Sequence, residues 1–176
     1  MKEIDTSLVH RLLYPAVPAL LCASKGRHTS AMPVVSLLSI SSRPPLVGVA
    51  CFVNSFTMKL AASSRAFSLC LLDRSKVRSM SYLASHSGRE VADKIAASGL
   101  KHVPARKVGA PVISGSVAVL ECSVHSRRRF GDHYLLVGRV QAAYSSGDFR
   151  GYWRFRNYEP ILYTGWRGGL RTYRSS

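Results

Sequence analysis

The sequence predicts a mainly β fold, a small antiparallel barrel of short strands with a few helices inserted. Two observations support this prediction. Short runs rich in Val, Leu and Ile are bounded by Gly, Pro, Ser or Asn, as is typical of strands and turns. Strands and helices do not alternate at regular spacing, which disfavours a sheet of βαβ units. The 176 residues are close to the ~150 residues of one domain, so we expect a single domain over residues 1–176.

The predicted strands fall into two groups. Apolar runs in the first half of the chain predict strands over residues 17–24, 34–41, 46–53 and 66–72. Residues 112–124 and 133–144 form the second group, and a connection over residues 126–132 predicts a long hairpin between them. Together these segments supply enough strands for a small barrel.

Two helices are expected in the middle of the chain. Asn54 has the residue type of an N-cap and predicts a helix that runs to about Ala62. Ser87 and Glu90 have the spacing of a capping box, which predicts a second helix over residues 91–97. Gly99 is well placed to adopt the left-handed conformation that ends this helix.

Positive charge dominates the chain. Lys and Arg total 25 against 9 Asp and Glu, a formal net charge of +16. We therefore expect an anionic partner, and the charge alone does not distinguish nucleic acid, an anionic membrane surface and a phosphate-bearing cofactor. The apolar stretch over residues 12–23 contains Pro15 and Pro18 and is shorter than the ~20 residues that span a bilayer. We expect no membrane helix and no secretory signal, and predict a cytoplasmic location.

The spacing of cysteines, histidines and acids excludes the common catalytic constellations. The four cysteines are far apart among apolar neighbours, which predicts buried thiols and no metal site. Asp132 precedes His133, but neighbouring residues of an extended strand point to opposite faces, so we do not expect them to pair. The sequence also lacks the Gly-x-Ser-x-Gly motif, and a hydrolase is therefore disfavoured.

Two segments suggest ligands from their residues alone. A helix start at Asn54, with Ser55 and Thr57 in its first turn, gathers backbone N–H groups and hydroxyls at the positive end of a helix, where phosphate binds well. An ordinary helix cap explains the same residues. The segment over residues 149–176 interleaves aromatic residues with Arg, and two interpretations stay open: a subunit interface, or base stacking with nucleic acid.

A series of short motifs follows one order along residues 9–165. The motifs are RLLYP at 11–15, TSAM at 29–32, SSRPPLVGV at 41–49, NSFT at 54–57, SGR at 87–89 with DK at 93–94, LEC at 120–122, and GDH at 131–133 leading to VGRV at 137–140. Their order and spacing resemble the flavin reductase-like family of FMN-binding split barrels, which includes flavoredoxin. The resemblance implies an antiparallel split β-barrel that binds FMN and forms a homodimer.

The resemblance also implies which residues contact the cofactor. Met32 stands twelve residues before Pro44, as in the family's flavin-contacting segment, although Ser30 and Pro33 replace that segment's Asn and Thr. Asn54 and Thr57 match the phosphate-binding segment, whereas Phe52 and Ser55 replace its arginines. The cations expected to meet the phosphate instead are Lys59, Arg89 and Lys94. The full expected cofactor set is Thr29, Ser30, Ala31, Met32, Pro33, Val34, Ser36, Val49, Ala50, Cys51, Asn54, Thr57, Lys59, Ser87, Gly88, Arg89 and Lys94.

In the family's reductases the His of Gly-Asp-His lies near the nicotinamide and the flavin, which makes His133 the expected catalytic residue; a structural hairpin histidine is the alternative. The implied activity is that of an NAD(P)H:flavin oxidoreductase. Its partners are then a nicotinamide nucleotide as transient donor, a flavin or other electron acceptor, and a second copy of the chain. Two further readings stay open: an electron carrier without NAD(P)H activity, and a basic RNA-binding barrel without flavin.

Overall fold

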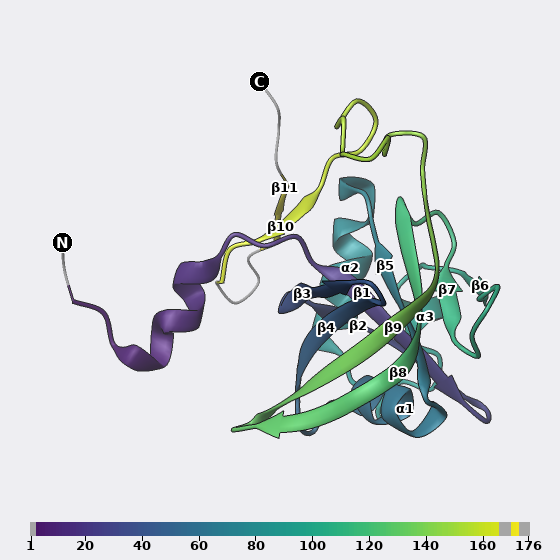
Figure 1. Cartoon of the computed structure of the whole chain (residues 1–176), viewed down its shortest axis with the longest axis horizontal. Coiled ribbons are helices and arrows are strands. Elements are labelled where there is room, and N and C mark those ends of the chain that lie inside the picture. Colours follow the sequence, from purple (N-terminus) through teal and green to yellow (C-terminus); the bar gives the residue numbers. More distant parts are fainter. Residues whose placement is uncertain (1–2, 166–169, 173–176) are drawn as a thin grey trace.

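The fold is built on one curled, antiparallel, seven-stranded sheet (Figure 1). The computed structural model describes residues 3–165 and 170–172. The strand order in the large sheet is β2-β1-β5-β8-β9-β4-β3. Its strands are β1 (Ala19–Lys25), β2 (His28–Val34), β3 (Leu37–Ser42), β4 (Pro45–Phe52), β5 (Ala66–Leu71), β8 (Ala118–Phe130) and β9 (His133–Ser145). The predicted antiparallel split β-barrel is confirmed.

Smaller elements surround this sheet. Two two-stranded ribbons pair β6 (His102–Pro104) with β7 (Pro111–Ile113) and β10 (Ile161–Tyr163) with β11 (Leu170–Thr172). The helices are α1 (Phe56–Ser64), α2 (Val77–Ser85) and α3 (Lys94–Ala97), with 3₁₀ segments η1 (Thr6–Leu13) and η2 (Arg74–Lys76). Figure 1 shows α1 at the lower end of the barrel and α2 near its upper part.

Two helix predictions need correction. Ser55, not Asn54, caps α1, because the Ser55 Oγ accepts the Met58 N–H at 3.3 Å. The Ser87 segment forms a turn, and α3 begins only at Lys94 under an Asp93 cap. The sequence does not predict α2, whose few apolar positions are diluted by Ser and Arg. Gly99 has φ +78° after α3, as expected for the residue that ends a helix.

Two strand predictions also change. The sequence does not predict β2, because Pro33 lies within it; the strand tolerates this proline because β2 is an edge of the sheet. The predicted strand over residues 112–124 is divided into β7 and β8, because Gly115 turns the chain with φ +76°.

The hairpin of β8 and β9 is tighter than predicted. Phe130 pairs directly with His133, so the connection is only Gly131, with φ +56°, and Asp132. The expected loop over residues 126–130 is strand instead, paired with residues 133–137. The arginines at positions 127–129 therefore lie on a strand that is paired residue by residue with β9.

Alternation along β1 divides the core in two. Leu21 packs with Met58 of α1 and with Phe67, whereas Leu20 faces the other way, toward Met80 of α2. All four cysteines are buried and unpaired, as predicted. Among residues 3–165 and 170–172, no group of His, Cys, Asp and Glu is placed to hold a metal ion.

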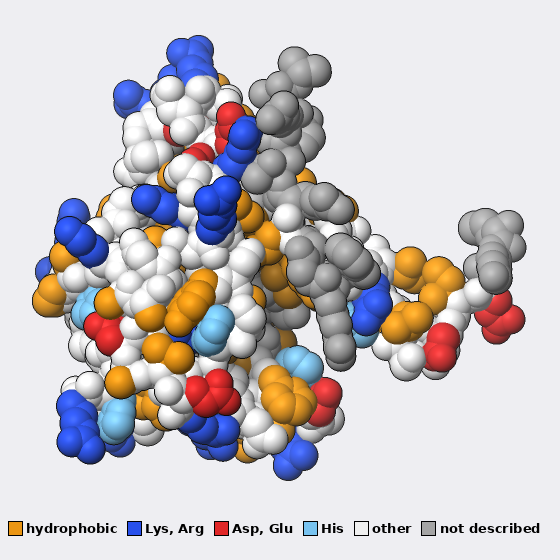
Figure 2. Space-filling model, turned by 180° about the vertical axis from the view of Figure 1, so that it is seen from behind, with side chains coloured by type: hydrophobic (Ala, Val, Ile, Leu, Met, Phe, Trp, Pro, Cys, Tyr) orange, Lys and Arg blue, Asp and Glu red, His pale blue; other side chains and the backbone are white. Residues whose placement is uncertain are grey.

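The N-terminal arm, residues 3–14, contains η1 and projects from the barrel (Figure 1). No residue of η1 is buried. Exposed hydrophobic side chains cover one side of the arm, which Figure 2 shows at the right: Ile4, Leu8, Val9, Leu12 and Leu13. In the part of the chain that the structure describes, no helix has the length and hydropathy to cross a membrane.

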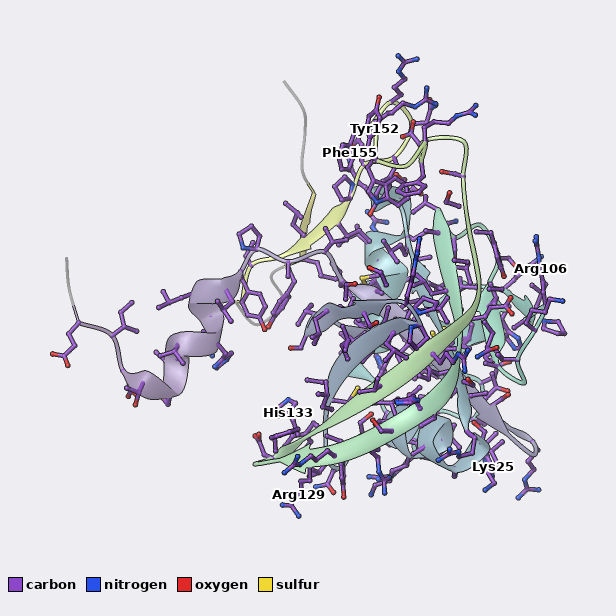
Figure 3. All side chains as sticks on the ribbon, viewed as in Figure 1. Lys25, Arg106, Arg129, His133, Tyr152 and Phe155 are labelled. Atoms are coloured by element: carbon purple, nitrogen blue, oxygen red, sulfur yellow. The ribbon has the colours of Figure 1, made fainter. Side chains whose placement is uncertain are left out.

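The C-terminal segment, residues 146–165 as far as the structure describes it, folds its aromatic residues against one another. The ring of Trp153 lies 4.7 Å from that of Tyr158 and 5.3 Å from that of Phe149. Tyr158 is buried, whereas Tyr152 and Phe155 stay exposed near the top of the molecule (Figure 3). Trp166 and Tyr173, which the sequence groups with this segment, lie outside the described residues.

Candidate functional site

Two adjoining hollows lie between β2, β4 and the start of α1. The wide hollow, about 790 Å³, is bordered by η1, β2, β4 and the tip of the β8–β9 hairpin. The narrow hollow, about 320 Å³, is bordered by the start of α1 and by residues 83–88. Four residues line both hollows: Met32, Pro33, Phe52 and Ser55. The two hollows therefore form one continuous candidate site.

The first turn of α1 opens onto the narrow hollow. Asn54, Ser55 and Thr57 all line it. Ser55 both accepts the Met58 N–H and donates its hydroxyl to the Met32 Sδ at 2.8 Å. Because the first N–H groups of a helix have no intrahelical partner, this end of α1 offers donors to an anion.

Lys94 adds a cation to the same hollow. Its side chain lines the narrow hollow although the residue is only 3% exposed. Burial lowers the pKa of Lys94 to about 8, and the Glu90 carboxylate offsets this only in part. Among the described residues the ion pairs are Arg74 with Glu159 and Asp132 with His133, so no carboxylate pairs with Lys94. A buried, unpaired ammonium group beside a helix start favours an anionic ligand.

The turn over residues 87–89 closes the narrow hollow. The Arg89 guanidinium donates to the backbone carbonyl of Asn54 at 3.0 Å and joins this turn to the start of α1. A Cβ at Gly88 would lie 2.7 Å from the Ser30 Oγ and 2.8 Å from the Phe56 ring, so a larger residue does not fit without a shift. Ser87 and Gly88 both line the hollow.

His133 and Asp132 form a pair at the wide hollow. The His133 Nδ1 lies 2.7 Å from the Asp132 Oδ1, and its ring makes an edge contact with Phe52 at 5.9 Å. The prediction that the two side chains point apart is wrong, because Asp132 belongs to the turn and not to the strand. The hydrogen bond from His133 is the main cause that lowers the pKa of Asp132. Figure 3 shows His133 near the tip of the hairpin.

The structure brings together most of the predicted cofactor residues. Met32, Pro33, Val34, Ser36, Ala50, Cys51 and His133 line the wide hollow, and Asn54, Thr57, Ser87, Gly88 and Lys94 line the narrow one. Arg89 and Ser30 line neither hollow but hydrogen-bond to residues that do. Arg89 donates to the Asn54 carbonyl, and the Ser30 hydroxyl bonds to that of Thr57.

Besides Arg89 and Ser30, four predicted residues line neither hollow. Val49 and Ala31 are fully buried in the two core clusters, Thr29 lies on β2 away from both linings, and Lys59 lines a third hollow. The structure also adds residues that the sequence does not suggest. Ser7 and His10 reach the wide hollow from the arm, and His86 reaches the narrow one from the end of α2. No local spacing links these segments to the site, since tertiary folding alone brings them there.

Comparisons with known proteins identify the family of the chain. Residues 10–162 match the family model of the flavin reductase like domain. An uncharacterized protein of Aeropyrum pernix is 31% identical over 166 residues, which cover 94% of this chain and 63% of that protein. The NADH-dependent FAD reductase of Streptomyces globisporus is 28% identical over 118 residues, covering 67% of this chain and 64% of that enzyme.

A solved structure gives the same result for the fold. The FMN-binding protein from Thermus thermophilus, with bound 1-cyclohex-2-enone, is 28% identical, has a TM-score of 0.81, and aligns over 98% of this chain and 93% of its own. The chain spans less than two thirds of the length of the Aeropyrum and Streptomyces relatives. Because the family model covers most of the chain and the barrel carries the two hollows in one site, the chain belongs to the flavin reductase-like family.

Proposed function

We propose that this protein binds FMN and acts as an NAD(P)H:flavin oxidoreductase. The observation that carries the proposal is Lys94, a buried cation without a carboxylate partner among the described residues, which lines the narrow hollow together with Ser55 at the start of α1. This arrangement suits the phosphate of a mononucleotide. The family and the FMN-binding relative support a flavin as the ligand.

The residues of the two hollows would bind different parts of FMN. Lys94 and the first N–H groups of α1 would hold the phosphate, and Met32, Pro33 and Ala50 would border the ring in the wide hollow. When bound, FMN supplies hydride acceptance and electron transfer, chemistry that the side chains of this site lack. The residues of the wide hollow would position the ring and leave room beside it for a nicotinamide.

His133 would orient the nicotinamide. Because the Asp132 carboxylate accepts from the Nδ1 side of the ring, the other ring nitrogen, Nε2, stays free for a polar group such as a carboxamide. The Phe52 ring supports the imidazole from one edge. NADH dependence of the Streptomyces relative supports a nicotinamide nucleotide as donor.

Two measurements test the function. FMN fluorescence titration of the purified protein tests cofactor binding, and steady-state oxidation of NADH and NADPH tests the donor. We expect tight FMN binding and oxidation of at least one nucleotide. FMN binding without oxidation would instead assign the protein as an electron carrier. Failure to bind flavin, with RNA bound in its place, would contradict the whole proposal.

We also propose that the protein is a homodimer. The N-terminal arm turns Ser7 and His10 toward the wide hollow and leaves an apolar face outside, with Leu13 81% exposed. Exposed apolar patches of this kind usually mark contacts between chains. The arm and the adjacent strands β3 and β4 carry few of the cations that would make copies of a +16 chain repel one another. A second copy of the chain would therefore cover the apolar face of the arm.

A further inference from the structure

A third hollow, of about 500 Å³, lies between the C-terminal half of α1 and β8. We call it the basic hollow. Of the described residues that line it, three are cationic and none is acidic: Lys59, Ala62, Ser63, Arg65, Val124 and Arg127. It shares no lining residue with the narrow or wide hollow. Lys59, expected from the sequence at the flavin phosphate, lies here instead.

The three cations of the basic hollow are exposed, and one of them has a fixed packing partner. Arg127 lies with its guanidinium carbon 4.6 Å from the centre of the Tyr134 ring. The backbone carbonyl of Arg65 accepts the Val124 N–H at 2.9 Å, which ties the end of α1 to β8. Three like charges around one space repel one another, and an anion between them removes that repulsion.

Arg65 has a conformation that its residue type disfavours. Its φ is +61°, in the left-handed region where glycine is the usual residue after a helix. A role in ending α1 would thus be served better by glycine. The positive charge needed near the helix carbonyls is already supplied by Lys25, whose Nζ donates to the Ser63 carbonyl at 3.1 Å. Figure 3 shows Lys25 beside the lower end of the barrel. The Arg65 side chain, which lines the basic hollow, is therefore not required to end α1.

We propose that the basic hollow binds a phosphorylated small molecule, at a site separate from the flavin. Its volume falls within the ~300–1,000 Å³ of small-molecule sites, enough for a nucleotide. Lys59 supplies a point charge, and Arg65 and Arg127 supply planar groups that bind phosphate oxygens in pairs. The chain's net charge of +16 also attracts anions to the molecule.

Isothermal titration of the full-length chain with inorganic pyrophosphate and, separately, with ADP tests the proposal. We expect one site for at least one of the two probes. Tighter binding of ADP assigns the site to a nucleotide, and tighter binding of pyrophosphate assigns it to a polyphosphate. If the wild-type protein binds neither probe, the proposal is wrong.

Three variants locate the site. Arg65→Gly and Lys59→Gln should each weaken binding about tenfold or more, whereas Arg78→Gln, an equal charge change on the exposed surface of α2, should leave it within about twofold. Since glycine accepts the φ of residue 65, Arg65→Gly should unfold at the same temperature as wild type or higher, so its loss of binding does not reflect unfolding.

Two results would overturn the assignment. An equal loss in Arg65→Gly and Arg78→Gln would mean that only net charge attracts the probe. Loss of probe binding in Lys94→Met, with Arg65→Gly unaffected, would place the probe in the narrow hollow. FMN titration of Arg65→Gly keeps the two sites distinct, because its FMN affinity should equal that of wild type whatever happens to the probe.

Discussion

The Ser30 and Thr57 hydroxyls lie 2.9 Å apart, and both residues are buried beneath the narrow hollow. One of the two hydroxyls donates to the other, and both residues are almost fully shielded from water. Thr57 is thus engaged by β2 at the same time as it borders the hollow. The start of α1 is fixed to the barrel wall by this contact, and not only by its own cap.

Thr57→Val should therefore reduce stability before it affects any ligand. The change strands the Ser30 hydroxyl, and we expect a loss of ~1–3 kcal/mol in the free energy of unfolding. The double variant Ser30→Ala with Thr57→Val should recover part of that loss, because neither polar group is then left alone. Urea unfolding of the four proteins in this cycle measures the coupling. Additive losses would mean that the contact contributes nothing to stability.

Lys94→Met should weaken FMN binding. It should also abolish the decrease in FMN affinity that we expect above about pH 8. The pKa of Lys94 in the flavin-free protein is about 8, and a bound phosphate favours the charged form. FMN affinity of wild type should therefore fall as pH rises above about 8, by up to about tenfold per pH unit, while the variant stays flat. Fluorescence titration from pH 7 to ~9.5 measures both curves. A wild-type curve as flat as the variant's would remove Lys94 from the phosphate site.

In the flavin-free protein, the titration of Lys94 should have the opposite effect: stability should rise with pH, whereas FMN affinity falls. Its pKa is lowered from 10.5 in the unfolded chain to about 8 on folding, so the unfolded chain binds more protons between these values. The free energy of unfolding of flavin-free wild type should rise across this range relative to Lys94→Met. Below it, the variant should be the more stable protein, because it buries no charge. Thermal unfolding without FMN, at pH 7 and ~9.5, tests the reversal.

His133→Ala should slow flavin reduction while FMN stays bound. If the imidazole orients the nicotinamide, its loss should lower the stopped-flow rate of reduction by NAD(P)H by about tenfold or more. Asp132→Asn keeps the ring but weakens the hydrogen bond to Nδ1, and we expect a smaller decrease. Loss of FMN from His133→Ala would assign the residue to cofactor binding. An unchanged rate would leave it a structural residue of the hairpin.

Glu121→Gln should destabilise the barrel more than Tyr144→Phe does. The buried carboxylate accepts the Arg106 N–H at 2.8 Å, the Lys107 N–H at 2.6 Å and the Tyr144 hydroxyl at 3.0 Å. The amide of Gln turns a donor toward one of these donors, at a cost of ~1–3 kcal/mol, whereas Tyr144→Phe removes a single bond.

The pH dependence of Glu121 follows from its environment. Burial raises the pKa of this carboxyl, but the three hydrogen bonds outweigh burial and lower it below 4.5. Its contribution to stability is therefore complete above about pH 4.5 and is lost as pH falls through the lowered pKa. The difference in unfolding free energy between wild type and Glu121→Gln should shrink in acid. A constant difference down to pH ~2 would contradict this account.

Light scattering should give about twice 19.3 kDa if the arm joins two copies. Changing Leu12 and Leu13 together to Asp should yield monomers, because charges replace the most exposed apolar residues of the arm. Tyr152→Ser serves as the control in the C-terminal segment. Should the control dissociate and the arm variant stay dimeric, the interface lies in the aromatic segment, as the interface reading of residues 149–176 implies.

The sequence predicts the barrel well because short apolar strands and turn residues are local signals. It misses β2, where Pro33 conceals a strand that only its edge position permits. It also misses α2, because that helix is stabilised mainly by packing Met80 and Leu83 into the second core. These elements depend on tertiary contacts, which no local pattern records.

In the candidate site, too, the residues near local sequence signals are predicted and those placed by tertiary structure are not. The motif order leads to Met32, Asn54 and Thr57, because these residues are close in sequence to recognisable turns and helix starts. It groups Lys59 with these residues, but Lys59 follows Thr57 by two residues, about 200° round α1, and so lines the basic hollow on another face. It predicts that Asp132 and His133 point apart, because it applies the alternation of an extended strand to Asp132, which lies in the turn.

The arginine run on β8 has a consequence that follows from register alone. Arg127 pairs with Leu136, which is fully buried, and so belongs to the inner side of the hairpin, whereas Arg128 pairs with Leu135 and packs over the Phe130 ring on the other side. Three consecutive arginines are therefore not one polybasic signal. A molecule approaching the hairpin meets two guanidinium groups or one, according to the side from which it comes. Because side chains alternate along the strand, the two sides of this hairpin carry different positive charge.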